Sequence, residues 1–244
     1  MSRTVLIDAD ILCYTVAYVN EVPTEFANGL FVLWADAEKT KVDLSDELDR
    51  ILEEVDADDY LLCLTDKDNF RKDILPSYKS NRSGSRKPMM LPFLREHIIS
   101  NLRHDVRRGL EGDDLMGIYA THPDLDGEWV IYSKDKDMKT IPALLWDFED
   151  GHVRKVSEEE ATRNWLFQTL TGDTTDGYSG CPKVGPVAAN KILDKECSFN
   201  AVIQAYEKAG LSKFEATQQA QVARILRSEN YDLETDTLTV WRPE

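Results

Sequence analysis

Three short apolar runs in this chain each lead into an acidic residue, and stretches with helical periodicity separate them. The runs cover residues 4–8, 60–66 and 129–133, and the third is followed directly by Lys134 and Asp135. Short runs rich in β-branched and aromatic residues, with helices between them, are typical of a buried parallel sheet. The sequence therefore predicts an α/β fold with a central, mostly parallel sheet.

The remaining segments supply turns, loops and helices. Residues 150–151 (Asp-Gly) predict a hairpin turn, and the polar, basic residues 80–88 predict a loop. Residues 157–160 (S-E-E-E) form a helix-capping box. A chain of 244 residues is expected to form one large domain, or one domain with an appended module. Helices are expected at residues 44–55, 91–102, 113–120, 157–170, 187–193, 199–209 and 213–228.

Composition excludes several classes of protein. Apolar residues make up 42% of the chain, which is enough for a sizeable core and excludes general disorder. No stretch reaches the roughly 18–20 apolar residues of a membrane span, and the first residues do not resemble a signal peptide. The four cysteines are far apart and form no C-x-x-C pair, which argues against a zinc site or disulfides. We therefore expect no membrane partner and a reducing, cytoplasmic location.

Charge is unevenly distributed along the chain. The net charge of −16, taken alone, argues against a partner that carries phosphate. Residues 67–108 nevertheless contain eleven Lys or Arg against four Asp or Glu. This segment is explained either as a solvated basic surface or as a basic wall that faces the acidic groups, which would suit an anionic substrate near metal ions.

Acidic residues form five groups, three of which follow the apolar runs. In an open α/β sheet, ligands bind beyond the carboxyl ends of the strands. If the strands extended that far, the period of two would place Asp8 and Asp10 on one strand face, and likewise Asp135 and Asp137. A helix N-terminus or a turn explains any single group. The groups are Asp8 with Asp10; Asp66; Glu111 with Asp113 and Asp114; Asp135 with Asp137; and Asp173 with Asp176.

Five such groups brought together would repel one another, and burial would raise their pKa values. A fold tolerates this crowding only if cations compensate it, and oxygen ligands favour Mg²⁺ or Mn²⁺. Two such ions about 4 Å apart clamp the attacking and leaving oxygens of a phosphoryl displacement. No side-chain base is then required, which is consistent with the absence of a catalytic sequence context around the four histidines, His97, His104, His122 and His152.

Several motifs in order resemble the flap endonuclease/5′→3′ exonuclease family, and most of all its short bacteriophage members. Residues 69–71 (NFR) with residues 78–82 (YKSNR) resemble the family's FR…YKxNR element. Residues 110–115 (LEGDDL) resemble its E-A-D-D segment, and residues 133–137 (SKDKD) its S-x-D-K-D. Residues 172–189 (GDTTDGYSGCPKVGPVAA) resemble G-D-x-x-D-N-x-x-G and the glycine-rich turn of a helix–three-turn–helix. The similarity begins at residues 6–14 (LIDADILCY) and extends over nearly the whole chain.

The resemblance implies a PIN-like nuclease domain over residues 1–160, with an arch at about residues 67–108, and a helix–three-turn–helix DNA-binding region over residues 161–244. Lys79 and Arg82 match basic residues at the base of the arch, where they would hold the scissile phosphate and neutralise transition-state charge; ordinary attraction of phosphate is the alternative. The implied metal ligands are Asp8, Asp66, Glu111, Asp113, Asp114, Asp135, Asp137, Asp173 and Asp176. Further implied nucleic-acid contacts are Arg71, Tyr78, Arg86, Lys87, Gly180, Lys183 and Gly185.

Two of these assignments stay open. Tyr78 would stack on a base of a threaded strand, but a core tyrosine explains it equally well. In the glycine-rich turn, Lys183 replaces the first glycine of the family's G-x-G and Val187 replaces a lysine, while Gly185 remains. The turn is expected to present backbone N–H groups and a helix N-terminus to duplex phosphates, with a K⁺ ion as a further implied ligand.

The function implied is that of a metal-dependent 5′-3′ exonuclease, with or without flap endonuclease activity. Two Mg²⁺ or Mn²⁺ ions per site are the implied cofactors. The implied partner is duplex DNA with a 5′ end, nick or flap, and an RNA–DNA hybrid would suit primer removal. Replication or single-strand-binding proteins are further implied partners, and a viral chain would act in the bacterial host cytoplasm.

Three alternatives compete with this interpretation. Asp8-Ala9-Asp10 resembles the D-x-D start of a haloacid-dehalogenase phosphatase, although that class has Thr or Val where this chain has Leu12. A small PIN-type ribonuclease uses similar chemistry, but its chain is shorter and lacks the glycine-rich turn. A non-catalytic DNA-binding protein on the same fold would have lost acids that are all present here.

Overall fold

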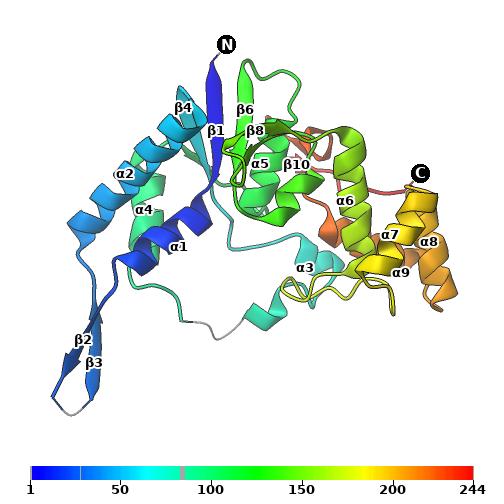
Figure 1. Cartoon of the computed structure of the whole chain (residues 1–244), viewed down its shortest axis with the longest axis horizontal. Helices are drawn as coiled ribbons and strands as arrows, with labels where there is room; N and C mark the ends of the chain where they lie inside the picture. Colours follow the sequence, from blue (N-terminus) through cyan, green and yellow to red (C-terminus); the bar gives the residue numbers. More distant parts are fainter. Residues whose placement is uncertain (1, 28, 83–85, 244) are drawn as a thin grey trace.

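The structure is a computed structural model that describes residues 2–27, 29–82 and 86–243, with Arg82 described in its backbone only. Within these residues, six strands form a central sheet in the order β5-β4-β1-β6-β7-β8 (Figure 1). All neighbouring strands are parallel except β7 and β8. The predicted α/β fold with a mostly parallel sheet is therefore confirmed. The strands are β1 (Arg3–Asp8), β4 (Asp59–Cys63), β5 (His104–Asp105), β6 (Glu128–Tyr132), β7 (Leu144–Asp147) and β8 (His152–Lys155).

The strand order reverses at β1, which lies between β4 and β6. Asp8 of β1 is aligned with Cys63 of β4, and Ile7 is aligned with Tyr132 of β6. The carboxyl ends of the three strands therefore meet at one edge of the sheet. Open α/β sheets bind their ligands at such a reversal, so the fold places a ligand site beyond these strand ends.

Both faces of β1 are covered, as its continuous apolar sequence predicts. Val5 and Ile7 point into a core cluster with three helices, and Leu6 points into a second cluster on the opposite face. All three side chains are almost fully buried, and each contributes about 1.5–3 kcal/mol by leaving water. The helices of the first cluster are α1 (Ala9–Val19), α2 (Ala37–Val55) and α4 (Leu91–Asn101), and α5 (Gly112–Ala120) packs in the second.

Strand β1 ends at Asp8, as the first apolar run does, so Asp8 and Asp10 do not share a strand face. The Asp8 carboxylate accepts a hydrogen bond from the N–H of Ile11 at 3.0 Å and so caps α1. Aspartate is a preferred N-cap because it satisfies an otherwise unpaired helix N–H. Helix α1 was not predicted, and it places Asp10 in its first turn rather than on a strand face.

The largest differences from the predicted helix boundaries are at the start of α2 and the end of α9. Helix α2 begins at Ala37, before the predicted residue 44, because the Asp36 carboxylate caps it through the N–H groups of Glu38 and Lys39. Helix α9 (Lys213–Ala223) ends before the predicted residue 228. Residues 224–227 continue without helical structure toward η3 (Ser228–Asn230) and the small antiparallel pair β9 (Tyr231–Asp232) and β10 (Thr237–Leu238).

The structure contains one hairpin that was predicted and one that was not. Strands β7 and β8 pair in antiparallel fashion around residues 150–151, as predicted. Strands β2 (Val22–Phe26) and β3 (Leu30–Trp34) form a second hairpin that was not predicted, and it projects from the body beyond α1 and α2 (Figure 1). Its side chains Phe26, Leu30 and Phe31 are exposed.

A third core cluster joins the C-terminal helices to the base of the arch. It contains side chains of α6 (Glu158–Thr171), α7 (Pro186–Lys195), α8 (Phe199–Lys208) and α9, together with the buried Tyr78. The division at residue 160 stays a prediction. None of the helices described here is both long and apolar enough to cross a membrane.

Candidate active site

A cavity of about 770 Å³ lies beyond the carboxyl ends of β1, β4 and β6. Its lining includes eight of the nine acids that the family resemblance implies as metal ligands, and Asp10. Five basic residues also line it, four of them from residues 67–108, so part of the basic segment does face the acidic groups. The eight acids are Asp8, Asp66, Glu111, Asp113, Asp135, Asp137, Asp173 and Asp176; the basic residues are Lys67, Lys79, Lys87, Arg95 and Lys136.

Strand ends supply the first acids. Asp8 closes β1, and Asp66 follows β4, where its carboxylate accepts a hydrogen bond from the N–H of Gly109 at 2.9 Å. That hydrogen bond lowers the pKa of Asp66. Asp135 follows β6 and accepts from the N–H of Asp137 at 2.9 Å, which begins the 3₁₀ helix η2 (Lys136–Thr140). Asp137 therefore lies in a helical turn, not on the strand face that the period of two predicted.

The start of α5 brings two more acids to the cavity. Glu111 is the N-cap residue and Asp113 lies in the first turn. The helix begins close to β4, because a side chain on Gly112 would come within 2.9 Å of the carbonyl oxygen of Cys63. The Gly112 N–H also donates to the Thr65 hydroxyl at 3.0 Å. Only a residue without a side chain fits this approach unless the neighbouring backbone moves.

A compact loop after α6 supplies the last two acids. The Asp173 carboxylate accepts from the N–H groups of Thr175 at 2.7 Å and Asp176 at 3.3 Å. The next residue, Gly177, has a φ of +75°, and a side chain there would lie 2.7 Å from the carbonyl oxygen of Ser77. This loop is therefore pressed directly against the base of the arch.

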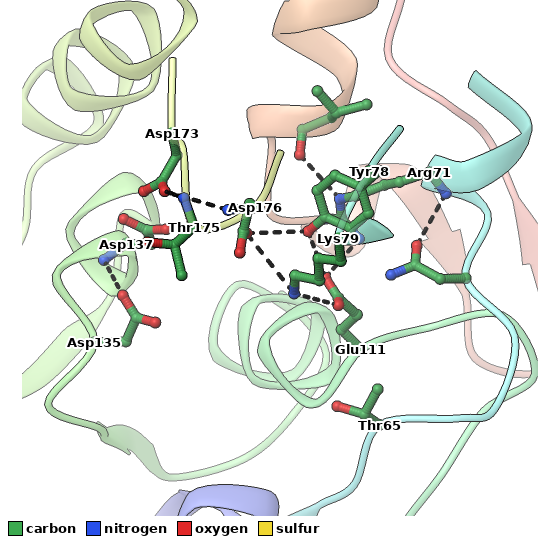
Figure 2. A network of polar contacts seen from close by, with 12 residues as sticks. Thr65, Arg71, Tyr78, Lys79, Glu111, Asp135, Asp137, Asp173, Thr175 and Asp176 are labelled. Carbon is green, nitrogen blue, oxygen red and sulfur yellow. Dashed lines mark hydrogen bonds and ion pairs between the residues drawn. The ribbon is translucent and has the colours of Figure 1, made fainter. Parts of the chain in front are cut away.

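Lys79 and Tyr78 connect this loop to Glu111, as Figure 2 shows. The Lys79 ammonium pairs with the Glu111 carboxylate, and the Tyr78 hydroxyl donates to Glu111 Oε2 at 2.9 Å. Burial opposes ionisation of Glu111, yet the positive charges of Arg71 and Lys79 lower its pKa. Tyr78 and Lys79 lie between α3 (Arg71–Ile74) and η1 (Ser80–Arg82), which form the base of the arch.

The electrostatics of the cavity favour cations. Burial, reinforced by the charges of Asp10 and Asp135, raises the pKa of Asp8 to about 6. Burial and the Asp135 charge likewise raise the pKa of Asp137 to about 6. Burial together with Asp8 and Glu111 raises the pKa of Asp113 well above its usual range. Carboxylates crowded in this way are a donor set that fits hard divalent ions.

Carboxylates of the cavity form ion pairs with lysines, and the acids that the structure describes do not converge on one point. Among the residues described, no three His, Cys, Asp or Glu side chains are already arranged to hold a metal ion. Glu111 is paired with Lys79, and Asp173 is paired with Lys136 at 3.0 Å. We therefore expect a divalent ion to compete with these two ammonium groups for carboxylate oxygens.

Two residues assigned from the sequence are wrong for the roles given to them. Asp114 was expected to bind metal, but it is fully buried and does not line the cavity. Arg71 was expected to contact nucleic acid, but it is 2% exposed and both of its terminal nitrogens donate to Asp114 at 2.7 Å. A guanidinium and a carboxylate that bind each other inside the protein are unavailable to DNA or to a metal ion.

Other predicted contacts to nucleic acid differ in accessibility. Tyr78 is buried in the third core cluster and bonded to Glu111, so the core alternative is correct in this structure and base stacking is not available. Gly180 is packed against Gly172, and its N–H donates to Gln219 at 2.8 Å. Exposed positions are Arg86, Lys87, Lys183 and Gly185. The side chain of Arg82 lies outside the part of the chain that the structure describes.

Two further residues of the cavity were not among the implied metal ligands: Asp10, which was grouped with Asp8, and Lys136, which had no predicted role. Asp10 accepts from the N–H of Thr65 at 2.8 Å and pairs with Arg95 at 2.8 Å, which fastens α1 to α4. Lys136 lies between two predicted acids and neutralises Asp173. The Asp8–Asp10 spacing and the basic segment contained these signals, but the pairing of Asp10 with Arg95 depends on tertiary structure.

Fold and cavity together define the class: a PIN-like α/β domain with carboxylates gathered at the reversal of its strand order. Residues 3–162 match the family of the 5′-3′ exonuclease N-terminal, resolvase-like domain. The chain belongs to this family. It is a nuclease and therefore a hydrolase, so the phosphatase and non-catalytic alternatives are set aside.

Known relatives agree with this assignment. The chain is 33% identical over 221 residues to an exodeoxyribonuclease of Enterobacteria phage T3, an alignment that covers 75% of this chain and 73% of the relative. The exonuclease of Escherichia phage T7 has the same identity and coverage. A flap endonuclease Xni of Shewanella pealeana is 27% identical over 184 residues, covering 69% of this chain and 70% of the relative.

A solved structure has the same fold. The T5 D15 protein, co-crystallised with metal ions, matches with a TM-score of 0.68 and 14% identity, over 91% of this chain and 89% of that chain. At this identity the match supports the fold alone.

Proposed function

We propose that the chain hydrolyses phosphodiester bonds at or near the 5′ end of duplex DNA, with two divalent cations held in the cavity. The observation that carries this proposal is the gathering of eight carboxylates from separate segments around one cavity, beside Lys79. The relatives from phages T3 and T7, named as exonucleases, support the activity. Crystal structures of the T5 D15 protein hold metal ions, and DNA with metal ions, and we propose the same kinds of ligand for the shared fold here.

Mg²⁺ or Mn²⁺ fits the proposed site. The candidate ligands are the eight predicted acids that line the cavity, namely Asp8, Asp66, Glu111, Asp113, Asp135, Asp137, Asp173 and Asp176. When bound, a pair of such ions makes hydroxide from water and stabilises the departing oxygen. The oxygen-only donor set favours these ions over softer metals.

Lys79 is the residue of this chain best placed to hold the scissile phosphate. Its side chain is 18% exposed and lies at the cavity between Glu111 and Asp176. A positive charge fixed at this place neutralises charge that develops on the phosphate oxygens in the transition state. Arg82 keeps its predicted role beside Lys79 as a proposal.

Duplex DNA would lie along the turn before α7. Lys183 and Gly185 are exposed there, and the space in front of the Gly185 α-carbon is open. A helix N-terminus with nearby N–H groups attracts phosphate. A K⁺ ion at this turn is proposed as well, and a higher duplex affinity in K⁺ than in Na⁺ at equal ionic strength would support it.

The substrate range of the site is a separate proposal. A duplex with a 5′ end, a nick or a flap would be cut, and so would RNA paired to DNA. A ladder of product sizes on blunt, nicked and flap substrates, each with a DNA or an RNA 5′ strand, separates these activities. Replication or single-strand-binding proteins as partners rest on the family resemblance alone.

Polarity is tested with duplexes labelled at the 5′ or the 3′ end in Mg²⁺. Small products should appear first from the 5′ label, and first release from the 3′ label would overturn the polarity. The Asp135→Asn variant should lose cleavage by on the order of 1,000-fold while it still binds duplex. Asp150→Asn, in the exposed β7–β8 turn, is the matched control and should cleave like the wild type.

A further inference from the structure

Arg71 joins three segments that are far apart in the sequence. Its guanidinium holds both carboxylate oxygens of Asp114 in α5, each at 2.7 Å. It also donates to the carbonyl oxygens of Val222 at 3.0 Å and Arg224 at 2.7 Å. The buried Arg71 guanidinium therefore links the arch, the start of α5 and the residues that follow α9.

Asp114 extends the same junction through the backbone. Its Oδ2 accepts from the N–H of Glu111 at 3.1 Å, and its Oδ1 accepts from the N–H of Leu226 at 3.0 Å. Each oxygen thus receives one bond from Arg71 and one from the backbone. Removing either partner would leave an uncompensated charge inside the protein.

Glu111 carries the connection to the cavity. Its carboxylate lies 3.5 Å from the Arg71 guanidinium, and it holds the Tyr78 hydroxyl and the Lys79 ammonium. Figure 2 shows these four side chains lying side by side. Arg71 itself does not line the cavity, whereas Glu111 and Lys79 do. A continuous series of contacts therefore runs from residues 222–226 to the groups that face the substrate.

Residues 222–226 pack tightly against helix α5. A side chain on Gly117, in the middle of α5, would overlap the carbonyl oxygen of Leu226. The backbone of this segment therefore lies directly on the helix that carries Glu111 and Asp113. Helix α9 must end at Ala223 for the chain to make this contact.

We propose that Arg71 is a positioning residue of the nuclease: with residues 222–226 seated, it fixes Glu111 and Lys79 at the cavity through Asp114. The C-terminal segment is then part of the catalytic scaffold, although it contributes no acid to the cavity. This inference rests on the proposed function of Glu111 and Lys79. A displacement of about 1 Å at such groups lowers the rate on the order of 100-fold.

The test compares Arg71→Lys, Asp114→Asn and the double variant Arg71→Met/Asp114→Leu by kcat, KM, melting temperature and duplex affinity in EDTA. Both single variants should lower kcat on the order of 100-fold, with KM and metal-free duplex affinity roughly unchanged. Apolar replacement of both partners often restores stability to a buried pair. The double variant should therefore regain melting temperature without regaining kcat, a result that a merely structural role does not give.

Arg3→Lys is the matched control. Arg3 is a half-buried arginine at the start of β1 that donates to Glu128 at 2.9 Å and to the Val55 carbonyl oxygen at 2.7 Å, and it does not line the cavity. It should lose melting temperature without losing kcat. If Arg71→Lys does not fold, the kcat values of Asp114→Asn and of the double variant test the inference.

Three results would overturn the inference: unchanged kcat in the folded variants, recovery of kcat with melting temperature in the double variant, or an equal loss of kcat in the control. Retained cleavage by Asp135→Asn would instead refute the proposed active site. Failure of the proposed function is therefore distinguishable from failure of the inference about Arg71.

Discussion

Lys79 meets Asp176 through both its backbone and its side chain. The Lys79 N–H donates to the Asp176 carbonyl oxygen at 2.8 Å, and the ammonium lies 3.7 Å from the Asp176 carboxylate. Lys79 holds a φ of 53°, a left-handed conformation that few residues other than glycine adopt. The base of the arch is thereby joined to the loop after α6 that carries Asp173 and Asp176, called the acidic loop here. The Lys79 ammonium is directed at the cavity.

Removing this ammonium should impair catalysis more than binding. We expect Lys79→Met to lower kcat by about 10²–10³-fold, because a fixed positive charge is lost where charge develops in the transition state. Lys87→Met is the comparison, since Lys87 lines the same cavity from an exposed position. It should mainly raise KM, and an equal loss of kcat in both variants would contradict the assigned role.

The contact between the acidic loop and the arch should depend on Gly177. Gly177 and Gly151 both have positive φ values, but only Gly177 has a neighbour in the space of a side chain, the Ser77 carbonyl oxygen. Gly151→Ala should cost about 1–2 kcal/mol of unfolding free energy from backbone strain alone. Gly177→Ala should cost more and should also lower kcat. Urea unfolding and single-turnover cleavage test both effects, and equal behaviour of the two variants would refute the close contact.

The contribution of Asp8 to the stability of the metal-free protein should fall as the pH rises. Burial raises the pKa of Asp8 to about 6, whereas an unfolded aspartate titrates near about 3.9. Between these values the folded chain retains a proton that the unfolded chain has released, so the contribution of Asp8 to stability falls with rising pH. Urea unfolding in EDTA from about pH 4 to pH 7.5 should show a weaker pH dependence for Asp8→Asn than for the wild type. Superimposable profiles would mean that Asp8 is not perturbed.

Duplex binding should depend on salt, and individual basic residues should contribute unequally. Lys183 is exposed on the turn before α7, so Lys183→Ala should reduce the salt slope of duplex affinity by about one. Arg86 is exposed too, but both of its terminal nitrogens donate to Glu21, at 2.7 and 2.6 Å. Arg86→Ala should therefore change the slope less. Titrations at several salt concentrations measure both slopes, and a larger change for Arg86 would show that its pair with Glu21 opens on binding.

The sheet could be predicted because its signals are local. Apolar runs that end in acids mark β1, β4 and β6, and parallel strands must bring those ends to one edge. The same reasoning places Asp8, Asp66 and Asp135 at the cavity, whereas the family resemblance assigned the full set of acids, and their role as metal ligands stays a prediction. Helix α1 was missed because the apolar run of β1 continues beyond Asp8, and the helix begins only through the capping bond to Ile11.

The sequence did not predict which basic side chains are buried in ion pairs and which face the cavity. The basic segment contains Arg71, Arg95 and Lys79 alike, yet Arg71 is buried with Asp114, Arg95 clamps Asp10, and Lys79 faces the cavity. Composition and spacing do not distinguish these cases, because each depends on an acid from a distant segment. The same holds for residues 224–227, whose helical pattern yields to hydrogen bonds with Arg71 and Asp114.

A crystal soaked in Mn²⁺, with anomalous diffraction recorded at the manganese edge, tests the central claim most directly. The account predicts two manganese peaks in the cavity, each about 2.0–2.3 Å from carboxylate oxygens, with Asp8, Asp113, Asp135 or Asp137 among the ligands of one. Peaks only at the protein surface, with Lys79 and Lys136 still paired to Glu111 and Asp173, would contradict it.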